Sequence, residues 1–129
     1  MRARPVLVTR SLAAAVLPLM TASSPAAEAP VRQIVLASHH YAPAVLILRA
    51  DTPVTLQFVN RAGKAHDFTA PRFFASARIV SGEVEDGEVD LGAGESRTVT
   101  LVPARGEYQV RCTKFLHRQL GMRGRIVVE

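Results

Sequence analysis

The chain contains little sulfur, with one cysteine and three methionines among 129 residues. A single cysteine excludes an intrachain disulfide. After the first 26 residues, no apolar run is long enough to cross a bilayer. The sequence also lacks internal repeats, low-complexity tracts, a basic helix and any recognised nucleic-acid-binding motif. These absences and the short length indicate one small domain that neither spans a membrane nor binds nucleic acid.

The N-terminal segment has the order of a secretory signal peptide. Three arginines precede a short apolar run at residues 11–20, and small residues follow it. The run is too short to span a bilayer and contains Pro18, so an uncleaved anchor is the poorer interpretation. We predict that residues 1–26 are a signal peptide and that residues 27–129 form an exported, periplasmic domain.

Removal of this leader changes both the charge and the sulfur count. Three of the 16 basic residues belong to the leader, which leaves 13 against 11 acidic residues and a formal charge of +2. The mature domain keeps one methionine, Met122, and one cysteine, Cys112. A lone thiol is unusual in an exported protein because oxidising compartments favour disulfides. Cys112 is therefore buried and inert, paired with another chain, or bound to a metal.

The mature region has strand patterns throughout. Residues 54–59 and 96–102 alternate apolar and polar side chains, and turn signals recur every 8–12 residues. Asp86-Gly87 predicts a solvated hairpin in the acidic segment 83–90, where the ligand spacing of a helix–loop–helix calcium site is absent. We expect an all-β, antiparallel sandwich or barrel with one helical turn at residues 73–78. Its strands are expected at residues 31–36, 45–48, 54–59, 96–102, 106–112 and 125–128.

Four side chains form a candidate metal site. Cys112, His117 and Met122 lie on the loop joining the last two expected strands, and His66 follows the turn after the third strand. Two imidazoles, a thiolate and a weakly bound thioether are the ligand set of a blue-copper site. Zinc and a Cys/His catalytic dyad are the alternatives, but neither accounts for a lone methionine five residues beyond His117.

Three further residues near these segments have possible roles. The backbone N–H of Asp67 is a candidate donor to the cysteine sulfur, and its side chain is a candidate tie to the Cys112 loop. His39 and His40 form an adjacent pair that is able to bind a second metal, although exposed polar residues at a strand end are the simpler interpretation.

The segment 106–128 resembles the C-terminal motif of the cupredoxins, and residues 60–68 are similar to their upstream histidine segment. The resemblance covers nearly all of residues 31–129. It implies a Greek-key β-sandwich of seven or eight strands in which Tyr108 pins the corner before the cysteine. It also implies one type 1 copper ion, cycling between Cu(I) and Cu(II), with the ligands His66, Cys112, His117 and Met122.

The chain departs from familiar members of this family in three ways. Four residues separate Cys112 from His117, and four separate His117 from Met122, a spacing nearest to rusticyanin-like members. The azurin disulfide is absent, and Asp67 stands where many members carry asparagine.

The resemblance implies a monomeric one-electron carrier, and not an enzyme, since multicopper catalysis needs additional histidine clusters. A copper-delivering carrier and an accessory domain of a metal-uptake complex are the alternatives. Basic residues crowd the ligand loop, so we expect a redox partner that is acidic and docks near His117. These residues are Arg111, Lys114, Arg118, Arg123 and Arg125.

Overall fold

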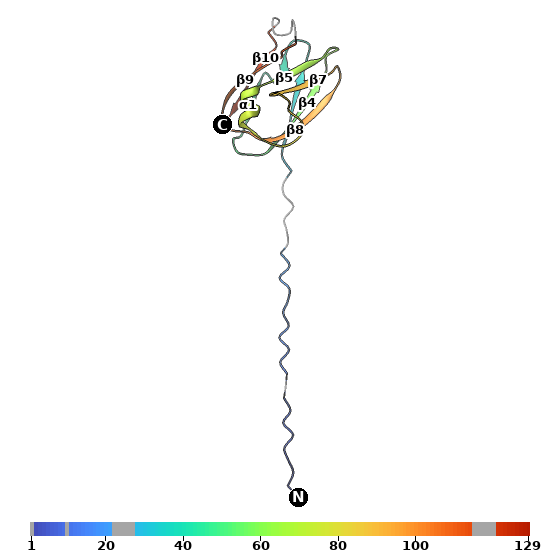
Figure 1. The fold of residues 1–129 in the computed structure, drawn as a ribbon, viewed down its shortest axis with the longest axis vertical. Helices are drawn as coiled ribbons and strands as arrows, with labels where there is room; N and C mark the ends of the chain where they lie inside the picture. Colours follow the sequence, from blue (N-terminus) through green and yellow to red (C-terminus); the bar gives the residue numbers. More distant parts are fainter. Residues whose placement is uncertain (1, 10, 22–27, 115–120) are drawn as a thin grey trace.

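The computed structural model describes residues 2–9, 11–21, 28–114 and 121–129. Within these ranges, the domain is a sandwich of two five-stranded sheets with one short helix, α1 (Pro71–Ser76), at one side (Figure 1). Residues 2–9 and 11–21 form no helix or strand and lead away from the sandwich as an extended tail (Figure 1). No helix in the described ranges is long and apolar enough to cross a membrane.

The first sheet has the strand order β2-β1-β4-β8-β6, and the second has the order β3-β10-β9-β5-β7. The strands of the first sheet are β1 (Val31–Leu36), β2 (Tyr41–Ala42), β4 (Val54–Asn60), β6 (Arg78–Ser81) and β8 (Ser96–Val102). Those of the second are β3 (Val45–Leu48), β5 (His66–Thr69), β7 (Glu88–Leu91), β9 (Gly106–Arg111) and β10 (Arg123–Val128).

The predicted all-β sandwich is confirmed, with two differences in detail. The described residues form ten strands, whereas seven or eight were expected. Two of the ten are the short strands β2 and β6 at the edges of the first sheet. The sheets are also mixed, since β1 pairs with β4 and β3 with β10 in parallel. Both differences concern pairing partners, which the alternation of side chains within one strand does not specify.

The core lies between the two sheets and is closed at one side by α1. Every second residue of β4 is buried, from Val54 to Asn60, as its alternating sequence predicts. Pro71 begins the helix at a position that tolerates proline, and Phe73 is fully buried. The Phe73 and Tyr108 rings pack edge to face with centroids 5.4 Å apart, which joins the helix to β9.

The turn at Asp86 and Gly87 forms where it was predicted. Both residues have positive φ, 50° and 75°, and Glu85 bridges to Glu88 across them. A Cβ at position 87 would lie 2.6 Å from the Cα of Pro71, so glycine is required there. The strands on either side of this turn belong to different sheets, so the acidic segment connects the sheets and is not a hairpin of two paired strands.

Candidate metal centre

His66 is the first residue of β5 and is 1% exposed. Its position depends on the preceding turn, which Asn60 organises from the end of β4. The Asn60 amide nitrogen donates to the carbonyl oxygens of Lys64 at 2.8 Å and Gly92 at 3.0 Å. The Asn60 carbonyl oxygen accepts from the backbone N–H of Ala62 at 3.0 Å. This buried amide therefore fixes the loop that delivers the imidazole.

Cys112 and Met122 occupy neighbouring positions at the same end of the second sheet. Cys112 directly follows β9, Met122 directly precedes β10, and these two strands pair in antiparallel fashion. The backbone N–H of Cys112 donates to the carbonyl oxygen of Met122 at 3.2 Å, and both residues have 0% exposure. The thiol and the thioether are thus held on one pair of strands.

The register of the sheet brings His66 to Cys112. Strand β5 pairs with β9 through Thr69 and Arg111, and the Cys112 Sγ lies 3.8 Å from the His66 Nδ1. Two donor atoms bonded to one ion at about 2.0 and 2.3 Å, at a trigonal angle of about 120°, are separated by about 3.7 Å. The buried sulfur and nitrogen are therefore spaced to bind a single metal ion.

The predicted tie between Asp67 and the Cys112 loop is present. The Asp67 Oδ1 accepts from the backbone N–H of Thr113 at 2.9 Å, and Oδ2 accepts from the Thr113 hydroxyl at 2.6 Å. Thr69 donates a third hydrogen bond to Oδ1 at 2.7 Å. The Tyr41 hydroxyl donates to the Asp67 carbonyl oxygen at 2.6 Å. Sequence reasoning found Asp67 from its place beside His66 but missed both threonines and the tyrosine, which carry no pattern of their own.

The environment of the thiol combines burial with hydrogen-bond donors. Burial raises the pKa of Cys112, while hydrogen bonds from the backbone N–H groups of Asp67 and Lys114 act in the opposite direction. Among the described residues, the sulfur therefore has two backbone donors, the expected N–H of Asp67 and the N–H of Lys114. Such donors stabilise a thiolate, which is the form that binds metal.

The corner before Cys112 is closed by Tyr108, in agreement with its expected role. The Tyr108 hydroxyl donates to the carbonyl oxygens of Ala104 at 2.8 Å and Arg105 at 3.2 Å, and it accepts from Ser76 at 3.1 Å. These bonds fasten the start of β9 to the loop before it and to α1. They hold the strand that ends at Cys112.

The basic residues around the ligand loop differ in their surroundings. Lys114 forms an ion pair with Asp90 at 3.0 Å, and Arg125 forms one with Glu107 at 3.4 Å. Arg111 and Arg123 are exposed and lie opposite each other across β9 and β10. Asp90 of the acidic segment thus reaches Lys114 and offsets part of the positive charge around the ligand loop.

Two predicted residues, His117 and Arg118, lie outside the described residues. His39 and His40 are exposed in the connection between β1 and β2. Among the residues that the structure describes, no group of three or more His, Cys, Asp or Glu side chains converges as a metal site. The described part of the candidate centre is therefore His66, Cys112 and Met122.

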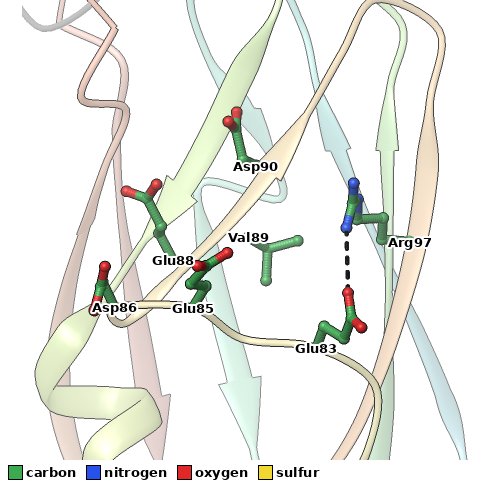
Figure 2. Close-up of a pocket in the computed structure, with 7 residues that line it drawn as sticks. All are labelled: Glu83, Glu85, Asp86, Glu88, Val89, Asp90 and Arg97. Atoms are coloured by element: carbon green, nitrogen blue, oxygen red, sulfur yellow. Dashed lines mark ion pairs between the residues drawn. The ribbon is translucent and has the colours of Figure 1, made fainter.

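The acidic segment lines a pocket (Figure 2). The Glu83 carboxylate faces Arg97 at 4.0 Å (Figure 2). Val89 is the one apolar side chain of the lining. The lining residues are Glu83, Glu85, Asp86, Glu88, Val89, Asp90 and Arg97.

Comparison with known proteins gives a family and a set of similar structures. A model of the cupredoxin-like domain family matches residues 10–128. Auracyanin B is 24% identical with a TM-score of 0.59, and the match covers 84% of this chain and 93% of that one. Auracyanin A, a "blue" copper protein from the green thermophilic photosynthetic bacterium Chloroflexus aurantiacus, is 18% identical with a TM-score of 0.57, covering 79% and 100%.

The multicopper oxidase McoA from the hyperthermophile Aquifex aeolicus has a TM-score of 0.63 at 12% identity. The match covers 84% of this chain but 31% of the oxidase. At these identities the likeness demonstrates a common fold. No curated protein matches the chain.

Proposed function

Because the chain belongs to the cupredoxin-like domain family, we propose that it is an exported type 1 copper protein that carries one electron at a time between redox partners. The observation that carries this proposal is the 3.8 Å separation of the Cys112 sulfur and the His66 Nδ1, both buried, with Met122 directly before the adjoining strand β10. The proposed ligands are His66, Cys112 and Met122, together with His117.

The donor set suits copper. A thiolate and imidazoles bind Cu(II) and Cu(I), and a long thioether contact tunes the reduction potential. Bound copper supplies the one-electron couple between these two oxidation states. Zinc, the main alternative, prefers several thiolates or histidines without methionine in structural sites.

The protein's own contribution is a fixed and largely buried set of ligands. Neighbouring strands hold His66, Cys112 and Met122, and hydrogen bonds that Thr113 donates to the Asp67 carboxylate join the first two segments. A ligand set that stays in place in both oxidation states keeps the structural rearrangement on electron transfer small. Burial of all three described side chains would keep water away from their donor atoms.

The proposed partner is an acidic redox protein that docks near His117. Arg111 and Arg123 support this proposal, because they lie side by side at the end of β9 and the start of β10 and take part in none of the ion pairs among the described residues. Their charge would steer an acidic surface toward the ligand loop. Replacing both with glutamate should slow electron exchange at low salt by tenfold or more, and an unchanged rate would contradict this docking site.

We propose a periplasmic monomer with no catalytic role. An imidazole, a thiol and a thioether lie near the same end of the second sheet, while a catalytic Cys/His dyad would also need an orienting group and a substrate cleft. The signal peptide at residues 1–26 remains a prediction. N-terminal sequencing of the secreted protein would locate the cleavage site.

Repeated redox cycling distinguishes an electron carrier from a copper carrier. The copper-loaded protein is reduced and reoxidised in the presence of a strong Cu(I) chelator, and bound copper is measured after each cycle. An electron carrier takes up one electron per copper and retains its metal. Rapid loss of Cu(I) to the chelator, with slow electron exchange, would overturn the proposal in favour of copper delivery.

A third outcome separates the accessory-domain alternative. A protein that binds copper tightly but exchanges electrons with no soluble mediator would fit a domain whose metal serves a larger metal-uptake complex. Cys112→Ser is the control for both measurements, because it removes the thiolate while keeping the side-chain size nearly constant.

A further inference from the structure

Asp67 is a fully buried acid between the two segments that carry His66 and Cys112. Its side chain has 0% exposure, and both carboxylate oxygens accept hydrogen bonds from Thr113 or Thr69. All three contacts come from donors, two hydroxyls and one backbone N–H, as an acceptor-only carboxylate requires. The geometry is therefore that of a buried negative charge neutralised by dipoles.

Asp67 takes part in none of the ion pairs among the described residues. Lys114, two residues beyond Cys112, instead pairs with the exposed Asp90. The main chain of Asp67 is also held in place, because its carbonyl oxygen accepts from the Tyr41 hydroxyl and its N–H bonds to the Cys112 sulfur. The charge is thus fixed in the shell of residues that contacts the thiol.

We propose that the Asp67 carboxylate sets a low reduction potential for the bound copper. This inference rests on the proposed function. A fixed negative charge stabilises the more positive oxidation state, and a buried site screens that interaction less than water does. Asp67 acts on the metal through its field and through Thr113, so it is a positioning and tuning residue and not a ligand.

The substitution Asp67→Asn tests the charge separately from the shape. Asparagine keeps an oxygen for the Thr113 N–H, and the Thr113 hydroxyl is able to rotate and accept from the new amide group. We expect the equilibrium constant for reduction by a reference mediator to rise at least tenfold, which is a potential shift of about 59 mV upward. The copper–thiolate absorption band should remain.

The matched control is Asp90→Asn. Asp90 lies opposite Asp67 in the pairing of β5 and β7, but its side chain is exposed. The substitution removes the same unit of negative charge as Asp67→Asn does. Because water screens that site, we expect less than a threefold change in the same equilibrium constant. An equal shift in both variants would overturn the inference, since net charge alone would then account for it.

Thr113→Val gives a second test with the opposite sign. It removes the hydroxyl that neutralises Oδ2 while leaving the carboxylate in place. The potential should therefore fall below that of the unsubstituted protein. This result supports the inference even if Asp67→Asn does not fold, and an unchanged or higher potential in Thr113→Val overturns it.

The outcomes also separate this inference from the proposed function. If the unsubstituted protein binds Cu(II) without an intense thiolate band, the type 1 site itself is rejected. In the other outcome, the unsubstituted protein and the Asp67→Asn variant are both blue, with equilibrium constants for reduction that differ by less than threefold. In that case the role of Asp67 is rejected and the copper site stands.

Discussion

Replacing Thr113 with valine should measure how strongly the two ligand-bearing segments are tied together before any metal binds. The substitution keeps the branched shape of the side chain and removes the hydroxyl that donates to the buried Asp67 carboxylate at 2.6 Å. A hydrogen bond to a charged group contributes about 1.5–3 kcal/mol, and a buried carboxylate that loses a donor is costly. We expect the free energy of unfolding of the metal-free protein to fall by about 1.5–3 kcal/mol.

Urea unfolding followed by far-UV circular dichroism provides the assay, since the chain contains no tryptophan. For a small domain with a slope of about 1–3 kcal/mol per molar urea, this loss lowers the midpoint by roughly 1 M. Thr55→Val is the matched control, because Thr55 pairs with the neutral hydroxyl of Thr100 at 2.8 Å. Its cost should be about 0.5–1.5 kcal/mol.

A double-mutant cycle assigns the effect to the carboxylate. In an Asp67→Asn background, Thr113→Val should cost less than about 1 kcal/mol, because no buried charge then loses a donor. Equal costs in both backgrounds would refute the reasoning, as would a cost no larger than that of Thr55→Val. Either result would mean that Asp67 does not fasten the Cys112 loop to β5.

Three further substitutions test other parts of the account. Tyr108→Phe removes the hydroxyl that donates to Ala104 and Arg105 and should lower the free energy of unfolding by about 1–2 kcal/mol. Each kcal/mol corresponds to a fall in Tm of about 4–8 °C. An unchanged Tm would show that this hydroxyl does not stabilise the corner before β9. Burial, followed by the charges of Cys112 and Asp67, raises the pKa of Tyr41 above its ordinary value of 10.0. The folded state therefore holds this proton more tightly, so stability should fall by about 1.4 kcal/mol per pH unit as the pH rises above about 10, and Tyr41→Phe should flatten that slope. Met122→Leu should keep the blue band and shift the potential, and loss of the band would show that the thioether does more than tune the metal.

The sequence pointed to candidate site residues because the chemistry they suggest is local. Cys112 and Met122 are the only sulfur-bearing side chains that remain after the predicted leader, and the strands on either side alternate clearly. The turn at Asp86-Gly87 was equally predictable, since both residues tolerate positive φ.

Features that depend on pairing between distant strands were less accessible. Alternation shows that β1 and β4 are strands but does not reveal that they run parallel. The ion pair between Asp90 and Lys114 arises because β7 lies beside β5, so the acidic segment approaches the ligand loop. Thr69 and Thr113 gain their role only from the carboxylate that folding places between them.

The visible and electron paramagnetic resonance spectra of the Cu(II)-loaded protein test the central claim most directly. The account predicts an intense thiolate-to-copper absorption band that disappears on reduction and is absent in Cys112→Ser. A colourless Cu(II) protein, or one whose spectrum is unaffected by Cys112→Ser, would contradict a type 1 site at His66, Cys112, His117 and Met122.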